Sequence, residues 1–376
     1  MQSMRKKSDD RAVNQILIKA HKQGVDLAWD RADAMQPQCG FARLALCCSD
    51  CAAGPCRVSP FADSAQQTIC GRDGGDLVAA ALVRQVREGA LALVQLASAS
   101  GAELDAQALL TACSGDSMVD QHSAAGQLPG LAECAYQALA ALNQTRPLPA
   151  RPTRTQVNLG VLQADRTNIL VYGHVPPQTI AELANAAALQ GAVLLSMAGN
   201  EVSGEHNLPI VTNYVSQETP LLSGAVDLLV FGSQCVLPAV RKLAAELGIP
   251  GVAVGSRTTP FDAQAAVTLA CDHRRERAAA QLGLPAVTET LDTNYTAPHL
   301  RAVLAGPAAN AVKGLVYFGG CGNLANTQDR DLVKSAAELM EQGYLLVTAG
   351  CVGTALPKQA TAMPRPTTSA ARSTLG

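Results

Sequence analysis

The sequence predicts an α/β protein with an N-terminal helical domain, a Rossmann-like parallel-sheet domain and a second, incomplete Rossmann-like domain. Apolar residues recur at helical spacing in the first third of the chain. Short β-rich runs alternate with alanine-rich stretches in the second third, and this alternation begins again near residue 315 but soon stops. We therefore expect three domains: 1–150, 151–305 and 306–376.

The first domain is expected to be helical on either side of a cysteine-rich segment. Residues 1–34 have a polar helical pattern, and residues 35–76 form the cysteine-rich segment. Residues 102–144 again have a helical pattern. A helix is also predicted over residues 76–98, because apolar residues recur there at steps of three and four and so share one face: Ala79, Leu82, Val83, Val86, Ala90, Leu93 and Ala97. The proline-rich segment Arg146–Thr153 is the expected linker to the next domain.

After the linker, β-rich runs predict the strands Ile169–Tyr172, Val193–Leu195, Ile210–Thr212, Val226–Phe231 and Val252–Val254. Helices are expected between them, including Thr179–Leu189 and Leu237–Leu247. This order is typical of βαβ units in a parallel sheet.

A second βαβ unit is expected, with a strand at Leu315–Phe318, a helix at Asp331–Gln342 and a strand at Tyr344–Thr348. A doubly wound domain needs more strands, so this domain is expected to be incomplete. The Ser/Thr/Pro-rich tail from Ala360 to Gly376 is expected to be disordered, as in a truncated or frameshifted chain.

Composition excludes several classes of function. A net charge of -2 gives no basic surface for nucleic acid, and the apolar runs fall well below the roughly 20 residues of a membrane-spanning helix. The basic N-terminus leads into Ser8-Asp9-Asp10 rather than an apolar core, so we expect no signal peptide and a cytoplasmic protein. Twelve cysteines in a reducing compartment indicate metal or redox chemistry.

Six cysteines form an array near the N-terminus: Cys39, Cys47, Cys48, Cys51, Cys56 and Cys70. The last four can surround one [4Fe–4S] cluster, since small residues between them let the backbone approach it. Cys39 and Cys47 supply two thiolates, enough for a cluster shared across the two-fold axis of a homodimer. A zinc knot for the four, and buried free thiols for the pair, are the alternatives.

A second constellation follows the expected strands: His174, Cys235, Cys321 and Cys351. The carboxyl ends of parallel strands are where α/β proteins build their sites, so these side chains can converge on one metal centre. A single His or Cys after a strand is nevertheless more often structural. Cys113, Cys134 and Cys271 have no such placement and are expected to be small core residues.

The segment from Cys39-Gly40-Phe41 through the array to Cys70-Gly71 resembles the N-terminal region of anaerobic nickel–iron carbon monoxide dehydrogenases. Further similar stretches are Gly173-His174, Gly199-Asn200-Glu201, Thr212-Asn213, Ser216-Gln217-Glu218, Gln234-Cys235, Gly320-Cys321 and Gly350-Cys351.

The resemblance implies a homodimer that oxidises CO with water to CO2 and passes electrons to a ferredoxin-like acceptor. It implies a bridging cluster at Cys39 and Cys47 and a second [4Fe–4S] cluster at the other four array cysteines. It also implies a nickel–iron–sulfur cluster held by His174, Cys235, Cys321 and Cys351.

The sequence departs from that family in three places. Where the family has a cysteine before its Gly-Asn-Glu motif, this chain has Ser196-Met197-Ala198. The family's last ligating cysteine and its catalytic lysine would lie beyond residue 376, and residues 87–101 hold no histidine for a proton relay. Two other functions therefore stay open: a non-catalytic electron-transfer or redox-sensing protein that keeps the N-terminal clusters, and a hybrid-cluster-type reductase.

Overall fold

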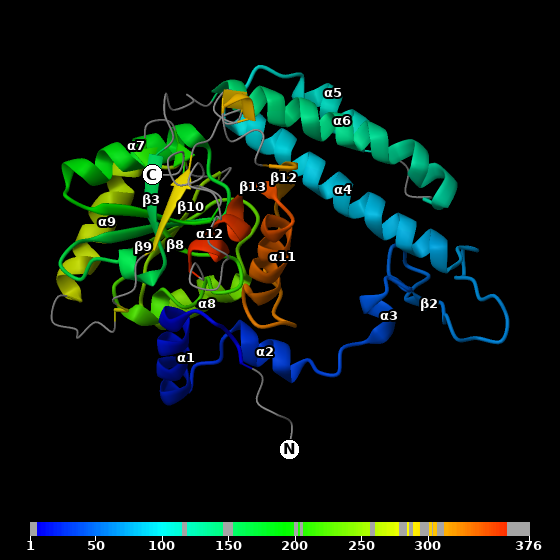
Figure 1. The fold of residues 1–376 in the computed structure, drawn as a ribbon, viewed down its shortest axis with the longest axis horizontal. Helices are drawn as coiled ribbons and strands as arrows, with labels where there is room; N and C mark the ends of the chain where they lie inside the picture. Colours follow the sequence, from blue (N-terminus) through cyan, green and yellow to red (C-terminus); the bar gives the residue numbers. More distant parts are fainter. Residues whose placement is uncertain are drawn as a thin grey trace. The chain divides into compact units, whose positions relative to one another are not determined.

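The computed structural model describes residues 6–114, 119–145, 153–198, 202–203, 206–255, 260–277, 284–285, 289–293, 301–302, 304–306 and 312–358. Contacts divide the chain into two compact units (Figure 1). We call Met1–Ala34 with Pro147–Gly376 the sheet unit, and Met35–Arg146 the helical unit. The sequence pattern grouped residues 1–34 with the helices, whereas their contacts place them in the sheet unit.

The sheet unit contains a seven-stranded sheet in the order β10-β9-β4-β5-β8-β3-β11. Its strands, in chain order, are β3 (Thr153–Val157), β4 (Asn168–Tyr172), β5 (Val193–Met197), β8 (Ile210–Thr212), β9 (Leu228–Phe231), β10 (Gly251–Ala253) and β11 (Glu289–Thr293). All neighbours pair in parallel except β11, which runs antiparallel to β3. The sheet is therefore mixed and mostly parallel.

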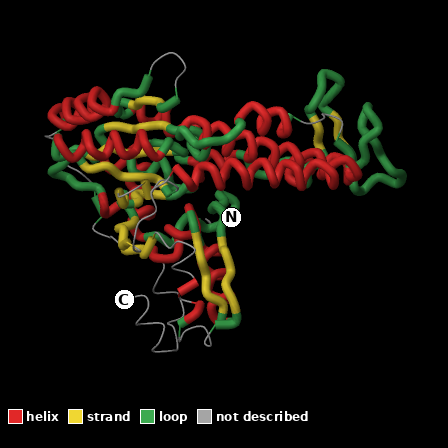
Figure 2. The backbone as a smooth tube through the Cα atoms, turned by 90° about the horizontal axis from the view of Figure 1, so that it is seen from above, coloured by secondary structure: helices red, strands yellow, loops and turns green. Residues whose placement is uncertain are grey.

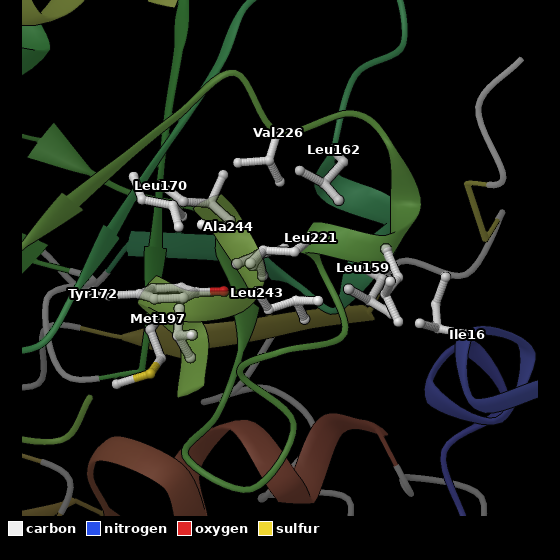
Figure 3. Packing of buried hydrophobic residues seen from close by; sticks show 14 of the residues in the cluster. Ile16, Leu159, Leu162, Leu170, Tyr172, Met197, Leu221, Val226, Leu243 and Ala244 are labelled. Atoms are coloured by element: carbon white, nitrogen blue, oxygen red, sulfur yellow. The ribbon is translucent and has the colours of Figure 1, made fainter. Parts of the chain in front are cut away.

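Central strand β4 is buried on both faces, and its alternating side chains separate two cores. Ile169 and Val171 pack in a cluster with α7 (Pro177–Leu189) and α9 (Ala263–Glu276). Leu170 and Tyr172 enter a second cluster, shown in Figure 3, to which α1 (Arg11–Gln23) and α8 (Pro238–Glu246) contribute. Helices on both faces explain why β4 reads as a continuous apolar run.

Several shorter elements complete the main part of this unit. They are α2 (Ala28–Ala34), the 3-10 turns η1 (Leu159–Val161) and η2 (Leu221–Ser223), and the two-stranded ribbon of β6 (Val202–Ser203) and β7 (His206–Asn207). Buried Glu218 fixes α2, since its carboxylate accepts the backbone N–H of Ala28 at 2.6 Å and pairs with Arg31 at 2.6 Å.

The last part of the sheet unit is a separate parallel pair, β12 (Gly314–Phe318) and β13 (Tyr344–Thr348), connected by α11 (Arg330–Glu341). Helix α12 (Gly350–Lys358) follows and begins at Gly350, whose φ of 58° is in the left-handed region. These elements match the strands and helix expected between Leu315 and Thr348.

The helical unit is built on α4 (Gly74–Ala99) and α6 (Gln121–Thr145), which lie side by side in Figure 2, with α5 (Ala106–Cys113) against them. Asp73 starts α4 with a capping box, because its carboxylate accepts the N–H of Asp76 while the Asp76 carboxylate accepts that of Asp73. The cysteine-rich segment contains α3 (Gly40–Arg43), β1 (Cys47–Cys48) and β2 (Cys56–Arg57).

The helix over 76–98 and the listed strands are confirmed within one or two residues. Strands β3 and β11 and helices α9 and α12 were not predicted. Most of the expected linker (146–152), the Gly-Asn-Glu stretch at 199–201 and the tail beyond 358 lie outside the described residues. Among the described helices, none has the length and apolarity that crossing a bilayer requires.

Candidate functional site

Four predicted ligands follow strands of the sheet unit. His174 comes two residues after β4, Cys235 follows β9, Cys321 follows β12, and Cys351 is the second residue of α12 after β13. Each leaves the carboxyl end of a parallel strand, the place where α/β proteins position functional side chains.

The loops of His174 and Cys235 touch through their backbones. The N–H of His174 donates to the carbonyl of Ser233 at 2.6 Å, and the N–H of Ser233 donates back at 2.9 Å. A Cβ at Gly232 would lie 2.1 Å from the His174 carbonyl oxygen, so the approach requires glycine there. This contact brings Nε2 of His174 to 3.6 Å from Sγ of Cys235.

Cys321 and Cys351 form a hydrogen-bonded thiol pair. The hydrogen bond from Cys351 lowers the pKa of Cys321 to about 6, and the same bond together with burial raises the pKa of Cys351. Burial also raises the pKa of Cys235, and the nearby charge of Cys321 adds to that effect. The three sulfur atoms are therefore close enough to influence one another's ionisation.

Tyr214 adjoins all three cysteines, and the sequence did not single it out. Its backbone N–H donates to Sγ of Cys351 at 3.4 Å. Burial raises the pKa of its phenol, and the charges of Cys235, Cys321 and Cys351 raise it further. The tyrosine lies directly after Thr212-Asn213, one of the stretches on which the resemblance rests.

Buried Gln217 connects Tyr214 to the Cys235 turn. Its Nε2 donates to the carbonyls of Tyr214 at 2.8 Å and Cys235 at 3.3 Å, and its Oε1 accepts the N–H of Leu237 at 2.8 Å. The turn needs this support because Gln234 and Cys235 both have positive φ, at 55° and 51°, which non-glycine residues rarely adopt. Only the fold reveals this role.

Residues 196–198, which stand where the related family has a cysteine before its Gly-Asn-Glu motif, supply no thiolate. Met197 is 1% exposed and packs in the apolar cluster beside Tyr172 (Figure 3). Oγ of Ser196 is buried without a hydrogen-bond partner, and a register irregularity of β5 lies between Ser196 and Met197. Ala198, rather than Met197, packs in the small cluster that contains Cys351.

A buried charge cluster lies elsewhere in the same unit. Its members are Asp10, Glu289, Asp329 and Lys358, and Nζ of Lys358 is 3.4 Å from Oδ2 of Asp10. The amide of Asn158 donates to Oδ1 of Asp10 at 3.2 Å and to Oε2 of Glu289 at 3.1 Å. Burial raises the pKa of Glu289 and of Asp329. Burial alone would lower the pKa of Lys358, but the surrounding carboxylates outweigh it and raise that pKa.

In the helical unit, the array cysteines lie around a small hairpin. β1 and β2 pair antiparallel with Cys48 opposite Cys56, and Cys51 lies in the connecting loop. A Cβ on Gly54 would lie 3.1 Å from the Cys48 carbonyl oxygen and 3.4 Å from that of Cys51, so glycine keeps this loop tight.

The turn that carries Cys70 is tied to the same loop. The N–H of Thr68 donates to the Arg72 carbonyl at 2.8 Å, and Arg72 reaches Asp50 of the hairpin loop at 3.2 Å. The hydroxyl of Thr68 lies 3.2 Å from Sγ of Cys70 and lowers the pKa of that thiol. Cys48, Cys51, Cys56 and Cys70 thus belong to two segments joined by an ion pair.

Cys39 and Cys47, the predicted shared pair, are both exposed. Cys39 precedes α3, and this short helix is held to the hairpin because the N–H of Leu46 donates to the Phe41 carbonyl at 2.8 Å. The guanidinium of Arg57, the cross-strand neighbour of Cys47, also stacks 5.1 Å from the centre of the Phe41 ring.

The donor atoms of both candidate sites are of the kind that iron–sulfur clusters use. All the array cysteines are free thiols, as are Cys235, Cys321 and Cys351. In the described part of the chain, no three His, Cys, Asp or Glu side chains converge on one metal-ion position. Thiolates are the ligands that iron–sulfur clusters use, and each ligand of a cluster binds a different metal atom.

Comparisons with known proteins agree with these features. Residues 116–373 match the model of the Prismane/CO dehydrogenase family. Carbon monoxide dehydrogenase 1 of Carboxydothermus hydrogenoformans is 27% identical, with 94% of this chain and 76% of the relative covered. Carbon monoxide dehydrogenase of Rhodospirillum rubrum is 25% identical over 93% of this chain and 75% of its own.

Solved structures share the fold. Carbon monoxide dehydrogenase IV from Carboxydothermus hydrogenoformans superposes with a TM-score of 0.75 at 23% identity, covering 94% of this chain and 76% of the other. A chain of the structure described as NiZn[Fe4S4] and NiNi[Fe4S4] clusters in closed and open alpha subunits of acetyl-CoA synthase/carbon monoxide dehydrogenase gives a TM-score of 0.78 at 20% identity, with coverage of 94% of this chain and 72% of that chain. The family match spans more than half of the sequence, and the chain therefore belongs to the Prismane/CO dehydrogenase family.

Proposed function

We propose that this protein is a carbon monoxide dehydrogenase-like iron–sulfur oxidoreductase. The reaction is oxidation of CO with water to CO2, with two protons released and two electrons passed to a ferredoxin-like acceptor. The observation that carries the proposal is the meeting of His174, Cys235, Cys321 and Cys351 at strand ends in one unit of a CO dehydrogenase family member.

The proposed cofactors follow from the donor sets. Cys48, Cys51, Cys56 and Cys70 would hold a [4Fe–4S] cluster, and Cys39 and Cys47 would share another with a second copy of the chain in a homodimer. His174, Cys235, Cys321 and Cys351 would hold a nickel–iron–sulfur cluster, which when bound supplies the two-electron oxidation of CO. The proposed location is the cytoplasm, where a reducing environment keeps cysteine thiols free to bind metal.

The chain's own residues prepare these sites for metal. Thiols bind metal as thiolates, so the proton in the Cys321–Cys351 pair must leave Sγ of Cys351 when the ligands engage. The Tyr214 N–H, already donating to that sulfur at 3.4 Å, would remain to stabilise the thiolate. Gln217 keeps the strained Cys235 turn in place.

A second candidate function is electron transfer or redox sensing through the N-terminal clusters alone. Met197 favours it, since this side chain at the place of the family's cysteine is packed in the apolar core and a thioether does not replace a thiolate. In this case the four strand-end ligands would bind no nickel.

Metal analysis of anaerobically purified dimer, combined with CO-dependent reduction of a viologen dye, distinguishes the two functions. About one nickel per chain, with iron beyond the roughly four per chain plus four shared of the N-terminal clusters, and CO-dependent dye reduction would support the proposal. Iron at only that N-terminal level, without nickel or dye reduction, would refute CO oxidation and leave the second candidate.

Two variants, Cys51→Ala and Cys39→Ala, test the ligand assignment, and Cys271→Ser serves as the control. Cys51→Ala should remove about four iron per chain, whereas Cys271→Ser, a matched change at a half-buried core cysteine, should keep them. Unaltered iron in the Cys51 variant would contradict the assignment. Cys39→Ala should chiefly weaken the dimer, which sedimentation velocity measures.

A further inference from the structure

A threonine hydroxyl lies against one of the four cysteines proposed to hold the [4Fe–4S] cluster of the helical unit. Oγ1 of Thr68 is 3.2 Å from Sγ of Cys70. The same oxygen accepts the backbone N–H of Arg72 at 2.9 Å. Thr68 and Arg72 are each 8% exposed, so this small network is largely shielded from water. No step of the proposed function uses the hydroxyl.

The direction of the hydrogen bond between Thr68 and Cys70 follows from its surroundings. The Arg72 N–H can only donate, so it leaves the hydroxyl hydrogen of Thr68 available for the sulfur. A cysteine that binds iron does so as a thiolate, which has no hydrogen to donate. With a cluster bound, Thr68 is therefore the donor and Cys70 the acceptor. In the free thiol, the same contact is the main cause of the lowered pKa of Cys70, because it favours the thiolate.

We propose that Thr68 raises the reduction potential of the [4Fe–4S] cluster held by Cys48, Cys51, Cys56 and Cys70. This inference rests on the cluster assignment in the proposed function, and it holds equally if the protein only transfers electrons. Reduction adds one electron to the cluster, taken from a reductant such as dithionite, and part of the added negative charge reaches the ligand sulfurs. A hydrogen bond to such a sulfur is therefore stronger in the reduced state, and hydrogen bonds of this kind help to set cluster potentials.

The turn that carries Thr68 holds its hydroxyl in place. The N–H of Thr68 donates to the Arg72 carbonyl at 2.8 Å, and the N–H of Gly71 donates to the Thr68 carbonyl at 3.0 Å. Gly71 has a φ of 92°, which glycine adopts without strain. Arg72 also reaches Asp50 of the hairpin loop at 3.2 Å, and α4 begins at Gly74 directly after this turn. The donor is thus positioned before a cluster binds, as the support of a functional site requires.

Thr68→Val tests the hydroxyl with little change in shape, because valine has a methyl group in its place. At a fixed potential, the ratio of reduced to oxidised cluster should fall about three- to tenfold, since part of the strength of a charge-assisted hydrogen bond is lost from the reduced state. A tenfold fall corresponds to a midpoint potential lower by about 59 mV for a one-electron couple. Thr68→Ser keeps a hydroxyl and should stay near the wild-type potential. The matched control is Thr111→Val, at an exposed position of α5 in the same unit, and it should leave the potential unchanged.

The experiment is a potentiometric titration of the anaerobically purified full-length protein, with dithionite as the reductant and EPR of the reduced cluster as the signal. The signal to follow is the one that Cys51→Ala lacks. Iron and sulfide contents are measured first in every variant. We expect equal iron contents in wild type, Thr68→Val and Thr68→Ser, with a lower midpoint only in Thr68→Val. Equal midpoints in wild type and Thr68→Val, with the cluster present in both, would overturn the proposal.

A second measurement covers the case in which Thr68→Val loses its iron, because this variant also removes the acceptor of the Arg72 N–H. In wild-type protein exchanged into D2O, pulsed EPR should detect a deuteron coupled to the reduced cluster, and Thr68→Ser should retain it. Absence of any such deuteron in the wild type would overturn the proposal by itself. Iron missing from the wild-type array would refute the cluster assignment and this inference with it, whereas equal midpoints in a loaded protein refute the inference alone.

Discussion

Gln217→Leu tests the claim that one buried amide holds the Cys235 turn in place. Leucine is close to glutamine in size, so the change removes hydrogen bonds while leaving little empty volume. It leaves three backbone groups without their partner: the carbonyls of Tyr214 and Cys235 and the N–H of Leu237. Gln217 itself is 0% exposed, so water does not reach the three backbone groups to replace the lost hydrogen bonds.

The expected loss follows from those three bonds. Two are short, at 2.8 Å each, and the third, at 3.3 Å, is weaker. Each buried group left unpaired costs about 1–3 kcal/mol, and the added apolar burial of leucine offsets part of that, so we expect a net loss of about 2–4 kcal/mol. With an m-value of about 3 kcal/mol/M for a unit of this size, the urea midpoint should fall by about 1 M.

Fluorescence of Trp29 provides the assay. It is the chain's only tryptophan, is 0% exposed, and lies in α2 of the same sheet unit. The matched control is Gln178→Leu at an exposed position of α7, where the lost bond is one surface contact with Glu182 at 3.1 Å. The expected change there is within about 0.5 kcal/mol. Equal urea midpoints for the two variants would refute the assigned role of Gln217.

Three further predictions concern other parts of the molecule. Gly54→Val brings a Cβ to 3.1 Å from a backbone oxygen of the hairpin, so the iron content per chain should fall. The control Gly130→Ala, whose Cβ would have nothing within 4 Å, should keep its iron. Equal iron contents in the two variants would contradict this prediction. Hydrogen bonding to Arg330 lowers the pKa of Asp9 from 3.8 to about 2, so Asp9→Asn should cost about 1 kcal/mol above pH 4, after allowance for exposure, and the cost should fade as pH approaches 2. Persistence of the full difference in urea unfolding at pH 2.5 would argue against this ion pair. Lys358 is the one cation of the buried charge cluster among the described residues, and Lys358→Met should cost about 3–5 kcal/mol at pH 7. Burial raises the pKa values of the Glu289 and Asp329 carboxyls, so the native state binds protons at a higher pH than the unfolded chain does. Part of the stability lost in Lys358→Met should therefore be regained as pH falls toward 5. A loss of stability that grows on acidification would count against the cluster.

Local pattern determined much of the secondary structure. The apolar run of β4 and the periodicity over 76–98 predicted a buried strand and a long helix, and both are present. Such elements are predictable because their burial repeats within a few residues along the chain. Strand β11, with the polar sequence Glu-Thr-Leu-Asp-Thr, carries no such repeat and forms as an edge strand by pairing with β3.

The candidate ligands were also readable from the sequence, because sulfur and imidazole donors are rare side chains placed after strands or at short spacings. Their supports were not readable. Gln217 lies in one of the stretches on which the resemblance rests, but the sequence does not show its role, which appears only when the fold places its amide between Tyr214 and the Cys235 turn. Cys113 and Cys134 were predicted to be small core residues, and the structure places both in one apolar cluster formed by α4, α5 and α6.

The sequence by itself therefore determined the chemistry that the chain can offer: twelve thiols, six of them in one array, and a series of strands and helices suited to an α/β fold. Tertiary structure alone decided which distant residues meet. It placed residues 1–34 in the sheet unit, where Glu218 fixes α2, and it assembled His174 with Cys235 across 61 positions of sequence. The physical reason is that contacts between distant segments depend on the packing of whole elements, which leaves no repeat in the local sequence.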